Sequence, residues 1–328
     1  MTSSWRTDEM NWNAIVALPL LAMLAGCTFL SEQAPAPQAE KAPAPPEKTY
    51  APPEQKSANG ASEPKVPLKI VFIDVGYGDA TLIQAGKKNI LFDAGPAGAE
   101  EKVKLALSQN GVEKLDVLAL SSNAPEHVGG AAEVSTSYPI ESVWTNGVNY
   151  TGEDYQNLLV RLSYAHPIRV EYGDTFTFDN VNFTILNPQK DRYLLSSAPD
   201  SIAMKVEYGN FCVLLFSDSQ AGSAAGNDMG TVVGGIDAKI VSGSLPIKCQ
   251  VLKVSHHGSG ISASFQLLEK AKPKTAIISV GEKQGSTLPE PVLLERLLLK
   301  GITTYRTDVS GTITITTDGQ AYNITAAR

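Results

Sequence analysis

Two adjacent histidines, His256 and His257, follow an apolar run in the segment VSHHGSG, residues 254–260. The chain has only four histidines in 328 residues, so half of them lie in this one segment. Imidazole groups at the end of a strand are typical of a metal site or of an acid–base site. Taken alone, the pair is equally compatible with a surface turn that happens to contain histidine.

Other ionisable side chains also stand at the ends of predicted strands. A single aspartate in such a place is usually a helix cap or a turn former. Several carboxylates and imidazoles that converge from different strands are how a hydrolytic zinc or manganese site is built. Strand ends are also where ligands bind in sheets covered by helices. The positions are Asp74, Asp79, Asp93, Glu126, His127 and Asp218.

Short apolar runs separated by glycine, proline and asparagine predict the elements that must hold these side chains. Helical spacing predicts the helices, and an Asp-Gly turn predicts a hairpin at 311–325. Strands interleaved with helices indicate sheets covered by helices, and the order of elements occurs twice. We therefore expect an α/β fold, a four-layer αββα sandwich. The strands are expected at 68–76, 80–85, 88–95, 114–122, 139–147, 175–188, 203–219, 249–258 and 274–281, and the helices at 99–111, 153–165, 262–272 and 289–301.

The first 27 residues have the pattern of a targeting signal. An apolar run of 13 residues, 14–26, has the length of a signal-peptide core and is short for a membrane span. It ends in LAGC, which resembles the lipobox of bacterial lipoproteins, in which the cysteine is lipidated. We expect cleavage before Cys27 and a lipid anchor on the periplasmic or cell-surface face of a bacterial membrane. The alternative, an uncleaved anchor, also places the rest of the chain outside the cytoplasm.

Residues 28–66 are rich in proline and alanine and have almost no large apolar side chains. Such a segment cannot bury a core, and its prolines favour extended chain. We expect a disordered tether at 28–66 that holds a folded domain, residues 67–328, away from the membrane.

The net charge of −7 argues against a generally basic, nucleic-acid-binding surface, although a local basic groove stays compatible with it. Three cysteines are too few for a disulfide framework. Cys212 and Cys249 each lie in an apolar run, and we expect two buried free thiols.

Seven stretches of the chain together carry a family resemblance. They resemble the metallo-β-lactamase domain of the competence-type, ComEC-like DNA-uptake proteins, over residues 68 to about 320. The resemblance implies an αββα sandwich with metal ions at the edge between two sheets, and a metal-dependent hydrolase that acts on phosphodiesters. The stretches are FIDVGYGDATLIQ, NILFDAG, EHVGG, LLFSD, VLKVSHHGS, AIISVG and YRTDVSGTITITTDG.

The chain departs from this family at the metal motif. Where the family has a run of histidines and aspartates, this chain reads SSNAPEHVGG, with Ser122 and Ala124 at the first two ligand positions. Leu288 stands where the family has a later histidine. The family's first ion therefore loses its ligands. The resemblance leaves a second set, Glu126, His127, Asp218 and His256, for at most one Zn²⁺ or Mn²⁺ per chain, or for none.

His256 is preferred to His257 because alternating strand geometry lets only one of the pair face the pocket. Asp74, Asp79 and His257 are expected around the ligands, with His257 ordering the loop. Two functions follow. One is a membrane-tethered hydrolase of phosphodiesters, nucleic acid among them, in which Asp93 or Asp218 orients a water activated by the ion. The other is a non-catalytic lipoprotein module for binding or scaffolding on the same fold.

Overall fold

The computed structural model describes residues 48–50, 67–148, 150–190, 201–218, 223–224, 232–233, 235–282 and 285–328. The predicted signal peptide, Cys27 and most of the predicted tether lie outside these residues. Within the described part of the chain, every helix is too short or too polar to cross a membrane.

Two large mixed sheets form the centre of the domain. The nine-stranded sheet has the order β1 (Lys48–Tyr50), β18 (Tyr322–Ala326), β17 (Ile313–Thr317), β2 (Leu68–Phe72), β3 (Thr81–Ala85), β4 (Lys88–Phe92), β5 (Leu115–Leu120), β6 (Ile140–Thr145), β7 (Pro167–Arg169). The seven-stranded sheet has the order β16 (Thr303–Arg306), β15 (Thr275–Ile278), β14 (Val251–Lys253), β11 (Phe211–Phe216), β10 (Ala203–Tyr208), β9 (Val181–Asn187), β8 (Thr175–Phe178). The short strands β12 (Ser223–Ala224) and β13 (Val232–Val233) pair separately.

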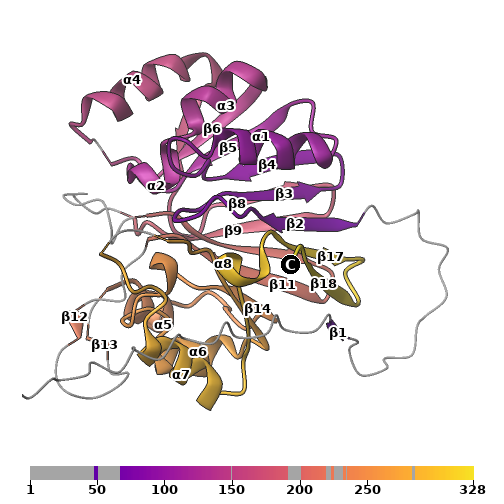
Figure 1. Cartoon of the computed structure of the whole chain (residues 1–328), viewed down its shortest axis with the longest axis vertical. Helices are drawn as coiled ribbons and strands as arrows, with labels where there is room; N and C mark the ends of the chain where they lie inside the picture. The colour runs from indigo at the N-terminus through magenta and orange to yellow at the C-terminus, as the bar shows by residue number, and fades with distance from the viewer. Residues whose placement is uncertain are drawn as a thin grey trace, which may run out of the picture. The chain divides into compact units, whose positions relative to one another are not determined.

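Helices cover the outer face of each sheet (Figure 1). On the nine-stranded sheet they are α1 (Glu100–Gln109), α3 (Ala131–Ser137) and α4 (Glu153–Arg161); on the seven-stranded sheet they are α5 (Gly235–Ser242), α6 (Phe265–Ala271) and α7 (Pro291–Leu299). The remaining short helices are α2 (Pro125–Val128), η1 (Ser163–Ala165), η2 (His256–Gly258) and α8 (Thr307–Ser310). The layers are helix, sheet, sheet, helix, so the predicted αββα sandwich is confirmed.

Strand β4 shows why the sequence reads as apolar runs. Ile90 and Phe92 point into the core between the two sheets, and Leu91 points into the core beneath the outer helices. Successive side chains of a strand face opposite sides, so a strand covered on both faces is apolar at every position. The same rule explains the fully buried strands β5 and β11.

Two features differ from expectation. Strand β1, inside the segment predicted as a tether, pairs antiparallel with β18. Cys212 and Cys249 form a disulfide with a Cα–Cα separation of 5.1 Å, so the prediction of two free thiols is wrong. The physical reason is strand order: β11 and β14 are parallel neighbours, and each cysteine lies near the start of one of them. The apolar character of each run does not reveal which run lies beside it.

Candidate metal centre

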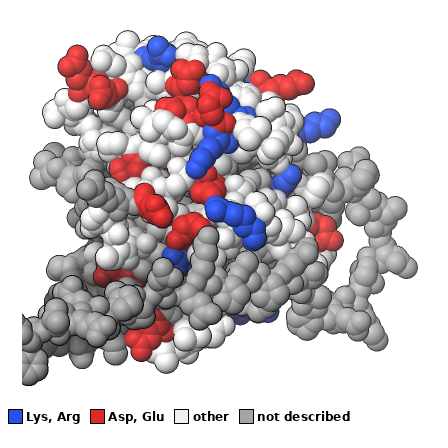
Figure 2. All heavy atoms as spheres, viewed as in Figure 1, with Lys and Arg blue, Asp and Glu red and all other residues white. Residues whose placement is uncertain are grey.

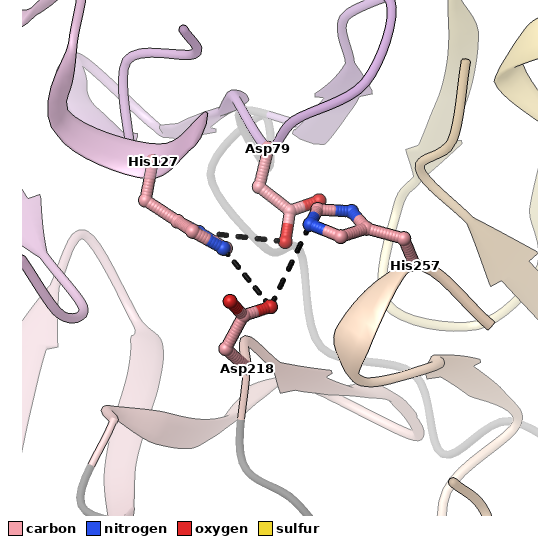
Figure 3. Close-up of side chains that lie close together, drawn as sticks. All are labelled: Asp79, His127, Asp218 and His257. Atoms are coloured by element: carbon pink, nitrogen blue, oxygen red, sulfur yellow. Dashed lines mark ion pairs between the residues drawn. The ribbon is translucent and has the colours of Figure 1, made fainter. Parts of the chain in front are cut away.

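Four buried side chains meet at one edge of the two sheets (Figure 3). Asp79 comes from the loop between β2 and β3, and His127 from α2, just after β5. Asp218 follows β11, and His257 follows β14. Because the parallel strands of both sheets end on the same side, residues far apart in the sequence converge there.

One ligand-type atom from each residue lies within 4.8 Å of the other three. His127 Nε2 is 3.0 Å and His257 Nε2 is 3.6 Å from Asp218 Oδ1. His127 Nδ1 is 3.7 Å from Asp79 Oδ2. Two imidazoles and two carboxylates at such spacing form a donor set suited to a transition-metal ion.

Each of the four residues also has a buried polar atom without a well-directed hydrogen bond, although His127 Nε2 and Asp218 Oδ1 lie 3.0 Å apart as an ion pair. These atoms are Asp79 Oδ1, His127 Nε2, Asp218 Oδ1 and His257 Nε2. Buried polar atoms are normally paired, because an unpaired one costs about 1–3 kcal/mol. Four such atoms gathered in one place fit a bound cation.

The other ring nitrogen of each histidine is held by an acceptor. His127 Nδ1 lies 2.8 Å from Asp93 Oδ2, and His257 Nδ1 lies 3.0 Å from the carbonyl oxygen of Ser279. A carboxylate and a carbonyl only accept, so each Nδ1 carries the proton and each Nε2 is left to face the cluster. Histidines that bind metals are usually oriented in this way.

Both carboxylate oxygens of Asp93 accept hydrogen bonds. Its Oδ1 accepts the Ser121 N–H at 2.8 Å, and its Oδ2 accepts the Ser121 hydroxyl at 2.7 Å. The Ser217 hydroxyl lies 3.1 Å from His127 Nδ1 and joins the same network. This network fixes the plane of the His127 ring.

A buried lysine completes the charge balance. Lys253 Nζ lies 2.7 Å from Asp79 Oδ2 and donates to the carbonyl of Phe216 at 3.0 Å. Three buried carboxylates, Asp79, Asp93 and Asp218, and this one ammonium leave two negative charges when both imidazoles are neutral. One divalent cation that displaces the Nε2 proton of His127 neutralises that charge, so the residues present fit a single ion.

The pKa values follow from this crowding. Burial alone would lower the pKa of His127, but the carboxylates of Asp218 and Asp93 outweigh it and raise the pKa well above its usual value. Burial would raise the pKa of Asp218, but the neighbouring His127 and His257 hold it well below its ordinary range. Burial lowers the pKa of His257, which favours its neutral, metal-binding form.

A glycine lets the loop of Asp79 approach α2. Gly78 has a φ of +153°, and a Cβ on it would lie 2.5 Å from the Glu126 carbonyl oxygen. The same oxygen accepts the Asp79 N–H at 3.1 Å. This contact ties the segment DVGYGDA to the segment PEHV and brings Asp79 beside His127.

Tyr77 of this loop lies beside the cluster. Its ring centre is 4.4 Å from that of His257. Burial and the carboxylates of Glu126, Asp218 and Asp79 raise the pKa of Tyr77 to about 12. The half-buried phenol therefore stays neutral and keeps its hydroxyl proton at the edge of the cluster.

The structure brings together His127 and Asp218 as expected, but it places His257 rather than His256 in the cluster. Strand alternation does not apply to this pair, because β14 ends at Lys253. Beyond it, His256 and His257 have φ values of 46° and 50°, so they are not strand residues. Asp79, which was expected around the ligands, is a member of the cluster. Glu126, which was expected as a ligand, is half-buried on α2 outside the cluster.

Two other expected site residues are not among the four of the cluster. Asp93 was expected to orient a water, but its contacts are with His127 and two serines behind the cluster. Asp74 was expected around the ligands, but its carboxylate accepts the Gly76 N–H and pairs with Arg328 instead. Gly76, two residues after Asp74, has a φ of +81°.

The three positions where the family motif is altered carry no ligand atoms at the cluster. Ser122 is buried and accepts the Ala124 N–H at 3.2 Å. Ala124 precedes the first residue of α2. Leu288 packs against the apolar core beneath α6 and α7.

Four residues around the cluster were not predicted from the sequence: Lys253, Ser121, Ser217 and Ser279. Lys253 could have been predicted, because a lysine inside the apolar run VLKV must be buried with the strand and needs a carboxylate partner. The three serines had none, because serine is common at strand ends.

No family model matches the chain. Three curated proteins with significant sequence similarity are "Recombination protein 2" of Haemophilus influenzae, "ComE operon protein 3" of Bacillus subtilis and "Competence protein ComA" of Neisseria gonorrhoeae. They are 29%, 24% and 27% identical to this chain over 74%, 75% and 73% of its length. The matches cover 28%, 32% and 31% of those proteins, so the chain corresponds to less than a third of each.

Solved structures with a similar arrangement include the metallo-β-lactamase fold protein YhfI from Bacillus subtilis, with a TM-score of 0.47, 14% identity, and coverage of 74% of this chain and 98% of that one. The diiron β-hydroxylase CmlA from Streptomyces venezuelae gives a TM-score of 0.49 and 12% identity, and covers 78% of this chain and 54% of that one. The four layers and the strand order of this chain give it the metallo-β-lactamase fold. Over the region that they share, the chain is a distant homologue of these competence and recombination proteins.

Proposed function

We propose that the domain binds one divalent transition-metal ion, Zn²⁺ or Mn²⁺, through Asp79, His127, Asp218 and His257, and that it hydrolyses a phosphodiester. The observation that supports this proposal is the group of four buried residues, each with a ligand-type atom within 4.8 Å of those of the other three. An ion bound there lowers the pKa of a water and polarises a phosphoryl oxygen.

The surrounding residues have separate roles in this proposal. Asp93 keeps the proton of His127 on Nδ1, and the Ser279 carbonyl does the same for His257. Lys253 neutralises Asp79, so the site takes a single divalent charge.

The substrate class is proposed from the relatives. Their names refer to competence and recombination, which supports a nucleic-acid phosphodiester. On the face that Figure 2 shows, the described Lys and Arg side chains are interspersed with Asp and Glu. That face lacks, among its described residues, the extended basic surface that binds nucleic-acid backbones, so we propose recognition at the site itself.

We further propose that the domain lies outside the cytoplasm, attached to a membrane through a lipid on Cys27. The sequence LAGC supports the lipid. The Cys212–Cys249 disulfide supports the compartment, because such bonds persist mainly where the environment is oxidising. Metabolic labelling with a palmitate analogue tests it: the wild type should be labelled and Cys27→Ala should not, and label retained by the variant would contradict the lipid.

A non-catalytic binding module is the second candidate. It is favoured by the changes at Ser122, Ala124 and Leu288, which remove family ligands for the second ion that clamps the leaving oxygen in two-ion phosphodiesterases. In this case the ion, or Lys253 alone, stabilises the fold.

Elemental analysis of protein purified with excess Zn²⁺ tests the ion site. We expect one ion per chain in the wild type and none in His257→Ala. His256→Ala is the matched control, since it removes the adjacent histidine outside the cluster and should keep the ion. A wild type without ion, or loss of the ion only in His256→Ala, would refute this site.

Hydrolysis of bis-p-nitrophenyl phosphate separates the two candidates. The hydrolase predicts turnover that a chelator abolishes, that Zn²⁺ or Mn²⁺ restores, and that His257→Ala lacks. One bound ion without turnover of this ester, or of single-stranded DNA, would favour the binding module.

A further inference from the structure

The turn that carries His257 has an unfavourable backbone. His256, His257 and Gly258 have φ values of 46°, 50° and 89°, three left-handed residues in succession. Only glycine adopts this region freely, and each other residue there costs about 1 kcal/mol or more. Such a turn persists only where its surroundings hold it.

The N-terminal end of α7 provides one set of contacts. The Glu290 N–H donates to the Gly258 carbonyl at 2.9 Å. The Glu290 carboxylate accepts the Gly260 N–H at 2.9 Å and lies 3.4 Å from the Ser259 hydroxyl. Pro289 packs so closely that a Cβ on Gly258 would lie 2.5 Å from its ring.

Arg296, two turns further along α7, provides the second set. Its side chain is buried, with 4% of the residue exposed. Nη2 donates to the Gly260 carbonyl at 2.9 Å, and Nη1 donates to the Ser262 carbonyl at 2.6 Å and the Ala263 carbonyl at 3.4 Å. One planar guanidinium thus bridges carbonyls of three residues, which a lysine ammonium does not match.

We propose that Arg296 and Glu290 are positioning residues that pre-organise His257 for metal binding. Neither contacts the four-residue cluster. Together they fix residues 258–263, so the left-handed turn is set in the folded protein before an ion arrives. The inference rests on the proposed ion site, because the fixed turn aims His257 Nε2 at the position between Asp79 and Asp218.

The two roles that α7 could have differ in their effects on the stability of the protein and on its affinity for the ion. If α7 only packed against the sheet, its variants would lower the melting temperature and leave the ion affinity of the folded protein unchanged. If α7 sets the turn, ion binding must also restore the turn in the variants, and the affinity falls. Losing a residue that orients a metal ligand typically costs about 10–100-fold in affinity.

The test compares Arg296→Lys and Glu290→Ala with the wild type, by Zn²⁺ affinity in chelator competition and by the visible absorption of bound Co²⁺. We expect affinity to fall about tenfold or more in both variants, with an altered Co²⁺ spectrum. Arg161→Lys is the matched control, because Arg161 also donates to a carbonyl, that of Ala132, on the far helical layer. It should match the wild type.

A third variant covers a failure of Arg296→Lys to fold. Glu290→Gln keeps an acceptor oxygen for the Gly260 N–H, so it should restore most of the affinity that Glu290→Ala loses. Folded Arg296→Lys and Glu290→Ala proteins with wild-type affinity and spectrum would overturn the proposal. So would equal losses in Glu290→Gln and Glu290→Ala.

A measurement on the metal-free protein tests the positioning role separately from ion binding. The Nδ1 proton of His257, bonded to the Ser279 carbonyl, should give a slowly exchanging ring signal by NMR in the metal-free wild type and a weakened one in Glu290→Ala. If the wild type binds no ion, the proposed function fails, and this signal still decides whether α7 holds the turn. An unchanged signal in Glu290→Ala overturns the positioning role.

Discussion

The ammonium of Lys253 lies 2.7 Å from a carboxylate oxygen of Asp79, and both side chains are fully buried. The pair joins β14 of one sheet to the loop before β3 of the other. It also places a fixed positive charge beside the proposed ion site, which lowers the charge that an ion must supply.

Lys253→Met should destabilise the metal-free protein and increase its dependence on metal. Removing one partner of a buried ion pair costs about 3–5 kcal/mol, because the other charge is left uncompensated. A divalent ion next to Asp79 offsets part of that cost. We expect added Zn²⁺ to raise the melting temperature of the variant more than that of the wild type.

The control is Lys205→Met. Lys205 is also buried, and it bonds to Glu207 and to the Pro246 carbonyl away from the cluster. Its variant should be destabilised by the same amount with and without Zn²⁺. An equal Zn²⁺ response in Lys253→Met and wild type would contradict the role of Lys253 at the site.

Asp93→Asn should weaken metal binding without removing a ligand. The side chain of Asn has one acceptor oxygen where Asp93 uses two, for Ser121 and for His127. With the amide nitrogen toward the ring, the proton of His127 moves to Nε2 and blocks coordination. We expect an affinity loss of about 10–100-fold by chelator competition.

Asp116→Asn serves as its control. Asp116 is buried and paired with Lys88 at the opposite end of β5, so the same substitution there should leave the ion affinity unchanged. If both variants bind Zn²⁺ like the wild type, Asp93 does not orient His127.

The layers of the fold were predictable because the strands are buried on both faces. In β4 and β5, continuous apolar runs of the right length between turn residues leave little choice of structure. The short helices α2 and α3 were missed, because PEHV and the small residues after it lack the spacing of an amphipathic helix.

The site was predictable as a region and less so as a ligand set. Asp218 and His127 directly follow strands, and strand order brings them together. The choice of His257 over His256 depends on backbone angles beyond the end of β14, which α7 imposes from more than 30 residues away. No local pattern around VSHHGSG contains that contact.

The disulfide should stabilise the domain without affecting the metal centre. Cys212 and Cys249 are 37 residues apart, and closing a loop of that length is worth about 4 kcal/mol through the unfolded chain. The cysteines lie near the starts of β11 and β14, and the cluster lies beyond the ends of these strands. Urea unfolding should therefore shift to lower concentration in the double variant Cys212→Ala/Cys249→Ala, with one Zn²⁺ per chain still bound. Loss of the ion in this variant would show that the disulfide also shapes the site.

Asp237 on α5 should make stability fall as the pH rises toward neutrality. Burial raises the pKa of its carboxyl to about 6, although the Ser264 N–H that it accepts opposes the shift. A carboxyl whose folded pKa is above its unfolded value contributes stability at low pH, and that contribution is lost as the pH rises through the folded pKa.

The free energy of unfolding of wild type relative to Asp237→Asn should therefore decrease between about pH 4 and about pH 6, by up to about 3 kcal/mol, and level off above. Asparagine keeps an oxygen for the Ser264 N–H, so the variant isolates the charge. Asp116→Asn is the contrasting control. The ion pairs of the wild-type Asp116 carboxyl outweigh its burial and lower its pKa. The stability that Asp116 contributes is therefore present above the unfolded pKa and is lost on acidification. Denaturant unfolding from neutral pH to below about pH 4, the unfolded pKa of an aspartate, measures both differences. A wild-type minus Asp237→Asn difference that does not change with pH would show that the buried carboxyl does not titrate there.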